Sequence, residues 1–127
     1  MEEKEFVPYN LALKLKELGF NEPCLSGYND RREPTVTVHV QGRNVDTFNY
    51  YERQSQYFVL RPTFSQVFRW FEKNHTLKCW VEWGSEYLEL ANYQDSFGIK
   101  HFISEHGTKE EAEVACLEKL IKILETK

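Results

Sequence analysis

The chain has 127 residues, 41% of them hydrophobic, and a formal net charge of −4. This is the length of one domain, with enough apolar material for a core without metal or disulfide staples, so we expect a single domain, residues 1–127. No stretch approaches the roughly 20 apolar residues of a membrane span, and the acidic N-terminal residues are unlike a signal peptide. We therefore expect a cytoplasmic protein with no membrane partner.

The three cysteines, Cys24, Cys79 and Cys116, are an odd number and lie far apart in sequence. They form no CxxC motif and no Cys/His spacing typical of zinc sites. This pattern predicts free thiols in a reducing compartment, no metal and no cofactor.

The first helix is predicted over residues 9–18, where leucines recur at positions 11, 15 and 18. Gly19 suits a left-handed C-terminal cap, and Phe20 can close the helix end. Turn-forming residues predict an irregular segment over 21–34.

The next segment is predicted to be extended. Alternating β-branched and polar residues over 35–40 predict a half-buried strand. Two further extended pieces are expected at 47–51 and 56–60.

The second helix is predicted over residues 64–74, with Thr63 and Gln66 as a capping box. Its helical spacing predicts a core face that comprises Phe64, Val67, Phe68 and Phe71. Gln66, Arg69 and Lys73 fall on the far side, and Trp70 falls at the border, so we expect it at the exposed side.

Strands are predicted over residues 77–83, 86–93 and 98–103, with a turn at Gly84 and Ser85 between the first two. His101 and His106 are expected to be loop or edge residues.

The last helix is predicted to begin at Thr108, which forms a second capping box with Glu111. Its wide apolar arc comprises Ala112, Cys116, Leu117, Leu120, Ile123 and Leu124. The order of elements predicts an α+β fold: one antiparallel sheet of about four to five strands with three helices packed on one side.

Motifs of common enzyme classes are absent from the sequence, including nucleotide-binding glycine loops, nucleophile elbows and metal-ligand spacings. Glu82, Glu86 and Glu89 flank the predicted hairpin and could converge for acid–base work; the alternative is a charged sheet face. We expect a protein that is not an enzyme, with a hydrolase or nuclease as the least favoured alternative.

The middle of the chain combines aromatic rings with cations. Residues 31–78 hold eight Lys/Arg and four Asp/Glu, and residues 48–83 hold eleven aromatics. Such a surface suits a protein-binding hot spot or base stacking with phosphate contacts. The predicted partner-binding residues are Arg53, Arg61, Gln66, Arg69, Trp70, Lys73 and Lys78.

Three blocks, residues 13–24, 62–71 and 110–121, resemble a family of small uncharacterised proteins from phages and mobile elements of Bacteroidetes. They cover about a quarter of the chain, and the family offers no catalytic residues to transfer. The resemblance implies a phage accessory protein. By analogy, it would inhibit or remodel a host defence complex, with an RNA-guided CRISPR nuclease or its guide RNA as partner, as anti-CRISPR proteins do. The alternative is an RNA- or single-stranded-DNA-binding module.

Overall fold

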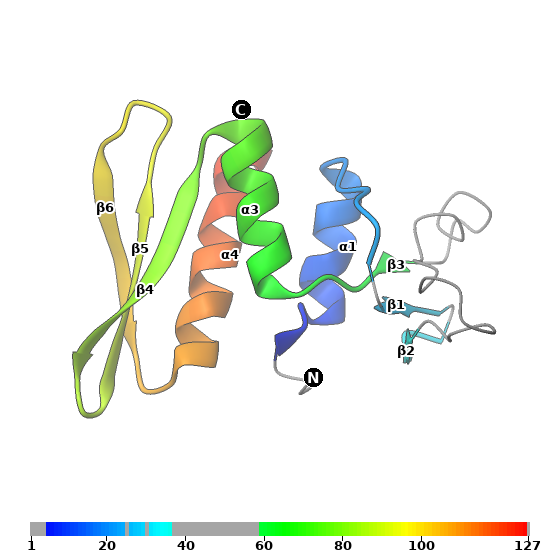
Figure 1. Cartoon of the computed structure of the whole chain (residues 1–127), viewed down its shortest axis with the longest axis horizontal. Coiled ribbons are helices and arrows are strands. Elements are labelled where there is room, and N and C mark those ends of the chain that lie inside the picture. Colours follow the sequence, from blue (N-terminus) through cyan, green and yellow to red (C-terminus); the bar gives the residue numbers. More distant parts are fainter. Residues whose placement is uncertain (1–4, 25, 30, 37–58, 127) are drawn as a thin grey trace, which may run out of the picture. The chain divides into compact units, whose positions relative to one another are not determined.

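The computed structural model describes residues 5–24, 26–29, 31–36 and 59–126 (Figure 1). The chain divides into two compact units. One, here called the N-terminal unit, is Phe6–Thr63; the other, the sheet–helix unit, is Met1–Glu5 with Phe64–Lys127. The strand expected at 47–51 lies outside the described residues, as do residues 37–40 of the strand expected at 35–40 and residues 56–58 of the piece expected at 56–60. The assignment of residues 1–127 to one domain stays a prediction.

The N-terminal unit begins with helix α1, Tyr9–Glu17, as predicted. Its end forms the predicted cap: Gly19 adopts φ +97°, in the left-handed region that favours glycine. The backbone N–H groups of Gly19 and Phe20 then donate to the carbonyls of Lys16 and Leu15, at 3.1 and 2.9 Å. Phe20 is buried, so this cap places a ring in the core of the unit.

A small antiparallel sheet in this unit has the order β2-β1-β3, with β1 at Ser26–Tyr28, β2 at Pro34–Val36 and β3 at Val59–Leu60. The segment that contains β1 was expected to be irregular because of its turn residues. Strand β1 is nevertheless buried, and the Tyr28 hydroxyl donates to the Val7 carbonyl at 2.7 Å. Tertiary pairing therefore overrides weak local β propensity here.

The sheet–helix unit has the order α3, β4, β5, β6, α4 (Figure 1). Helix α3 spans Phe64–His75, strands β4, β5 and β6 span Lys78–Ser85, Leu88–Gln94 and Lys100–His106, and helix α4 spans Lys109–Glu125. The strands form an antiparallel sheet in the order β4-β5-β6. At the start of α4, the Glu111 N–H donates to the Thr108 hydroxyl at 3.2 Å, as predicted.

The inner face of this sheet packs on the helices. Ala91 of β5 and Ala112 and Cys116 of α4 are fully buried, and small side chains at these positions let helix and strand approach closely. Cys79, Val81, Ile103 and Phe68 pack around them. Leu117 and Leu120 are also fully buried, each contributing about 1.5–3 kcal/mol of hydrophobic stabilisation.

The α+β class is confirmed, but the single sheet of four to five strands is wrong. The described strands before α3 pair only with one another, and those after α3 do the same, which gives two three-stranded sheets. The predicted turn at Gly84 and Ser85 is also displaced, to Glu86 and Tyr87, because a register shift between Trp83 and Ser85 prolongs β4. No helix among the described residues is long and apolar enough to cross a membrane.

Candidate functional site

The residues predicted to bind a partner are divided between the two units. Arg53 lies outside the described residues, and Arg61 belongs to the N-terminal unit. Arg61 is buried: its guanidinium carbon lies 4.2 Å from the centroid of the Phe6 ring, and Nη1 donates to the Ser26 hydroxyl at 3.3 Å. Arg61 is therefore a core residue of the N-terminal unit.

Trp70 is also buried, with 7% of its surface exposed, so its expected position at the exposed side of α3 is wrong. Its ring makes edge contacts with Phe71 and His75, at centroid distances of 5.0 and 4.9 Å. A residue at the border of a helix face can be drawn into the core when its side chain is large, because a Trp ring removes much apolar area from water.

Of the other predicted residues, Arg69 and Lys73 on α3 and Lys78 on β4 are exposed, and Gln66 is half-buried. Lys78 Nζ lies 3.6 Å from Glu72 Oε1, with both side chains more than half exposed, a geometry that contributes little stability. These positions keep the predicted cationic character but lose the predicted aromatic anchor.

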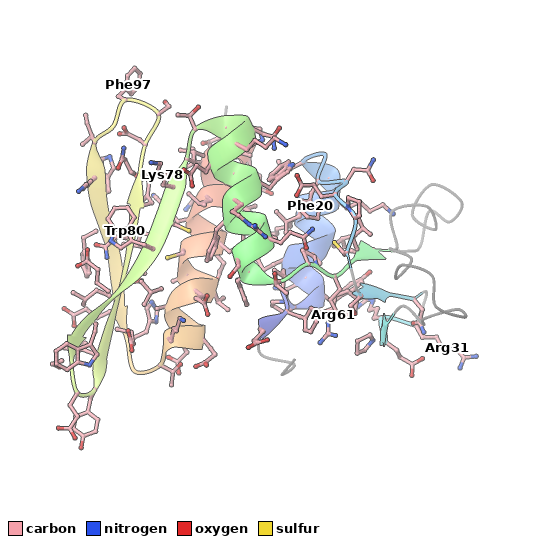
Figure 2. All side chains as sticks on the ribbon, viewed as in Figure 1. Phe20, Arg31, Arg61, Lys78, Trp80 and Phe97 are labelled. Atoms are coloured by element: carbon pink, nitrogen blue, oxygen red, sulfur yellow. The ribbon has the colours of Figure 1, made fainter. Side chains whose placement is uncertain are left out.

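The loop between β5 and β6 supplies an anchor that the sequence did not indicate. Phe97 is 88% exposed and Ile99 is 56% exposed. Figure 2 shows Phe97 at the tip of the β5–β6 connection, beyond Lys78. We call residues 95–99 the Phe97 loop.

Hydrogen bonds to Asp95 fix this loop. Asp95 Oδ1 accepts from the N–H groups of Phe97 and Ile99, both at 2.9 Å. The Asp95 N–H donates to the Ile99 carbonyl and the Gly98 N–H to the Asp95 carbonyl, both at 3.0 Å. Gly98 adopts φ +84°, which suits a short hairpin loop with a left-handed glycine. The loop is therefore a rigid support for an exposed ring.

A second layer of contacts holds Asp95 itself. Its Oδ2 lies 2.8 Å from Nε2 of His101, and the His101 ring stacks on Tyr93 with centroids 4.6 Å apart. Lys119 Nζ of α4 lies 5.7 Å from the centroid of Tyr93. The hydrogen bond from His101 and those from the Ile99 and Phe97 backbone lower the pKa of the Asp95 carboxyl, so it is ionised near neutral pH.

Lysines surround the base of the loop. The register pairs Gln94, which directly precedes the loop, with Lys78 on one side and Lys100 on the other. Lys119 lies on the helix side of the same end, where the three lysines accompany the carboxylates of Glu72 and Asp95. The opposite end holds the β4–β5 turn and the start of α4, with Glu86, Glu110 and Glu111.

The outer face of the β4-β5-β6 sheet is the second exposed feature. Trp80 and Phe102 flank Asn92 in one row across the strands. Phe102 is 58% exposed, and Trp80 Nε1 donates to Glu82 Oε1 at 2.7 Å on the same face. No element of the described sheet–helix residues covers this face, since α4 packs on the opposite one (Figure 1).

Two of the three acidic residues near the hairpin, Glu82 and Glu89, lie on opposite faces of the sheet. Glu82 pairs with Leu90 on the outer face, whereas Glu89 pairs with Trp83 one position along and faces the other side. Among the described residues, no group of three or more His, Cys, Asp or Glu could hold a metal ion.

The cysteines are buried or half-buried thiols. The hydrogen bond with Cys116 and burial in the sheet–helix core raise the pKa of the Cys79 thiol, which is therefore protonated at neutral pH. Cys116 also donates to the carbonyls of Trp80 and Asn92, at 3.6 and 3.8 Å. In the N-terminal unit, Cys24 donates to the Glu22 carbonyl at 3.3 Å. Cys24 and Cys116 therefore lie in the cores of their own units.

Three comparisons bear on the relationship of the chain to known proteins. No protein-family model matches it. No curated protein and no solved structure matches it either. The resemblance to phage and mobile-element proteins therefore stays a prediction.

Proposed function

We propose that this chain is a non-enzymatic binding protein that contacts a partner protein through the Phe97 loop. The observation that supports this is a phenylalanine, 88% exposed, on a loop held by five hydrogen bonds that involve Asp95. An apolar ring in water gains free energy when a partner buries it. A rigid loop loses little conformational entropy when it docks, so more of that gain appears as affinity.

The surroundings of the loop indicate the chemistry of the partner. Lys78, Lys100 and Lys119 lie around its base, so a matching site would be an apolar pocket with an acidic rim. Complementary charges of this kind raise association rates and select between partners. The sheet–helix unit as a whole carries eight Lys/Arg and eleven Asp/Glu between residues 64 and 127, which favours a protein over a polyanion.

The wider role we propose is the one implied by the resemblance to phage proteins. The chain would inhibit or remodel a bacterial defence complex, such as an RNA-guided nuclease, by occupying a site on it. The Phe97 loop replaces Trp70 and Arg61 as the contact centre, because those two side chains are buried.

The experiment compares two exposed aromatics at opposite ends of the same sheet. Tagged wild type, Phe97→Ala and Tyr87→Ala, in which Tyr87 is 78% exposed, are used to capture partners from a Bacteroidetes host lysate. We expect wild type and Tyr87→Ala to retain the same protein and Phe97→Ala to lose it. With the purified partner, loss of a hot-spot ring weakens binding by roughly 30-fold or more. Equal capture by all three proteins would refute the role of the loop.

RNA or single-stranded DNA is the second candidate, because a ring beside lysines can also stack on a base while the cations contact phosphate. In its favour, Lys100 Nζ lies 6.0 Å from the centroid of the Trp80 ring. This candidate predicts oligonucleotide affinity that falls steeply with salt. Sequencing of RNA from the captured material separates it from the protein partner, and no binding at low salt removes it.

A hydrolase or nuclease is the third candidate. It would need carboxylates that meet at one place, and Glu82 and Glu89 lie on opposite faces of the sheet. We therefore propose no catalytic residue.

A further inference from the structure

We propose that the outer face of the β4-β5-β6 sheet joins two copies of this chain into a symmetric dimer. The charges and rings on this face are ordered in a way that matches a second copy of itself. The proposal goes beyond the proposed function, because its centre is the row of Trp80 and Phe102 rather than Phe97; the two surfaces share only Lys78 and Lys100.

Three parallel rows cross the outer face. Strand register places Glu82, Leu90 and Glu105 in the first row, toward the β4–β5 turn. The middle row is Trp80, Asn92 and Phe102, and the third row, next to the Phe97 loop, is Lys78, Gln94 and Lys100. The face is therefore acidic, then aromatic, then basic along the strands. Figure 2 shows Phe97, Lys78 and Trp80 in this order from the loop toward the middle of the sheet.

This order is self-complementary under a two-fold axis. Let the axis lie between two facing sheets and run across the strands, along the middle row. The rotation leaves each row parallel to itself but exchanges the two ends of the strands. The aromatic row then meets the aromatic row of the other copy, and each basic row meets an acidic row. An isologous interface needs a surface that matches itself in this way.

The β6 strand shows the match most clearly. Under this axis β6 faces β6 of the other copy, so Lys100 lies opposite Glu105 and Glu105 opposite Lys100. Both side chains are exposed, which leaves them available for the pairing. On β4, Lys78 of one copy likewise lies opposite Glu82 of the other, although Lys78 also lies 3.6 Å from Glu72 on α3 of its own chain.

The apolar side chains of this face would gain free energy if a second copy removed them from water. Phe102 is 58% exposed, and Trp80 and Leu90 are half-buried. Two sheets that pack face to face lie about 10 Å apart, with their inner side chains interdigitated. The face of three short strands is small, at about 10 by 20 Å, so we expect a dimer that dissociates in the micromolar range rather than an obligate one.

The test uses two charge-reversal variants. Each introduces repulsion between like charges when it pairs with itself, and this repulsion is absent when the two variants pair with each other. Lys100→Glu gives a chain with Glu at both positions 100 and 105, and Glu105→Lys gives a chain with Lys at both. Each variant alone places like charges opposite each other, so each should be monomeric where wild type is dimeric in sedimentation equilibrium. An equimolar mixture places opposite charges at every contact and should restore a heterodimer.

Two further variants complete the design. Lys100→Glu combined with Glu105→Lys in one chain exchanges the two charges and should restore a homodimer. Lys122→Glu, an exposed reversal on α4, should leave the dimer unchanged, and so should Phe97→Ala. Circular dichroism checks that each variant is folded. Restored association in the mixture cannot arise from misfolding of either component.

Three results would overturn the proposal. The first is wild type that stays monomeric up to about 1 mM, well above the expected micromolar dissociation constant. The second is a dimer that Lys100→Glu and Glu105→Lys leave intact. The third is an equimolar mixture that stays monomeric, or that associates only when an oligonucleotide is added. The dimer test measures mass and the capture test measures partner retention, so either proposal can fail alone.

Discussion

His101 Nε2 of strand β6 lies 2.8 Å from Asp95 Oδ2 at the end of β5. The other oxygen of the same carboxylate accepts two backbone N–H groups of the Phe97 loop. One side chain therefore connects the edge strand of the sheet to the loop that exposes Phe97. The order of this loop therefore depends on Asp95.

Replacement of Asp95 should loosen the Phe97 loop in a graded way. Asp95→Ala removes both acceptor oxygens, so the N–H groups of Phe97 and Ile99 lose their partners. Asp95→Asn keeps one amide oxygen that can still accept these bonds, as Asn does in similar turns. Hydrogen exchange should become faster at both amides in Asp95→Ala and change less in Asp95→Asn. Glu118→Gln, an exposed carboxylate on α4, is the control and should leave both amides unchanged; equal exchange in all variants would contradict the role of Asp95.

Acid should release the same loop. The pKa of Asp95 is lowered in the folded chain, first by the hydrogen bond with His101 and then by the Ile99 backbone. Its contribution to stability is therefore complete above the ordinary aspartate pKa of about 3.9 and is lost as the pH falls through the lower folded value. The titratable side chain that contacts Asp95 is His101 of β6, which stacks on Tyr93, and Lys119 of α4 lies beside that ring.

An NMR titration of the Asp95 carboxyl carbon measures this shift directly. His101→Ala should raise the pKa of Asp95 toward its ordinary value, and the Phe97 amide should become exchange-labile at a higher pH than in wild type. His106→Ala is the matched control, because His106 bonds with Ser104 on the same strand. If both histidine variants titrate alike, His101 is not the cause of the shift.

The periodic elements of the fold could be predicted, because their signals are local. Leucine spacing and Gly19 predicted α1 and its end, and Thr108 predicted the start of α4. Strand β1 was missed because Ser26, Gly27 and Tyr28 form a strand through pairing with β2 and β3, which no local pattern indicates.

The candidate site could be predicted less well, for a physical reason. Helical spacing places Trp70 at the border between the core face and the solvent face of α3. Its burial depends on ring contacts with Phe71 and His75, which helical spacing does not indicate. Phe97 is a single aromatic residue in a turn, with no periodicity to mark its exposure. The signal that could have indicated this exposure is the pair of turn-forming residues around it, Asp95 and Gly98. Such residues predict a tight loop whose other side chains face water.

The last prediction concerns Gly19 at the end of α1, for which Gly107, before the start of α4, is a matched comparison. A Cβ added at Gly19 or at Gly107 would meet nothing within 4 Å, so neither substitution creates a clash. They differ in backbone conformation, because only Gly19 lies in the left-handed region, at φ +97°. Gly19→Ala should therefore cost about 1–2 kcal/mol of the free energy of unfolding. Gly107→Ala should be neutral or stabilise by about 0.4–1 kcal/mol, since it reduces the freedom of the unfolded chain.

Urea unfolding followed by circular dichroism measures both differences. The backbone N–H groups of Gly19 and Phe20 donate to the last carbonyls of the helix when residue 19 adopts the left-handed conformation. Gly19→Asn should therefore recover part of the lost stability, because Asn tolerates this conformation better than Ala. If Gly19→Ala is as stable as Gly107→Ala, the left-handed cap contributes nothing. A loss confined to Gly19→Ala, with partial recovery in Gly19→Asn, assigns the cost to the backbone conformation, because the three variants differ in neither burial nor charge.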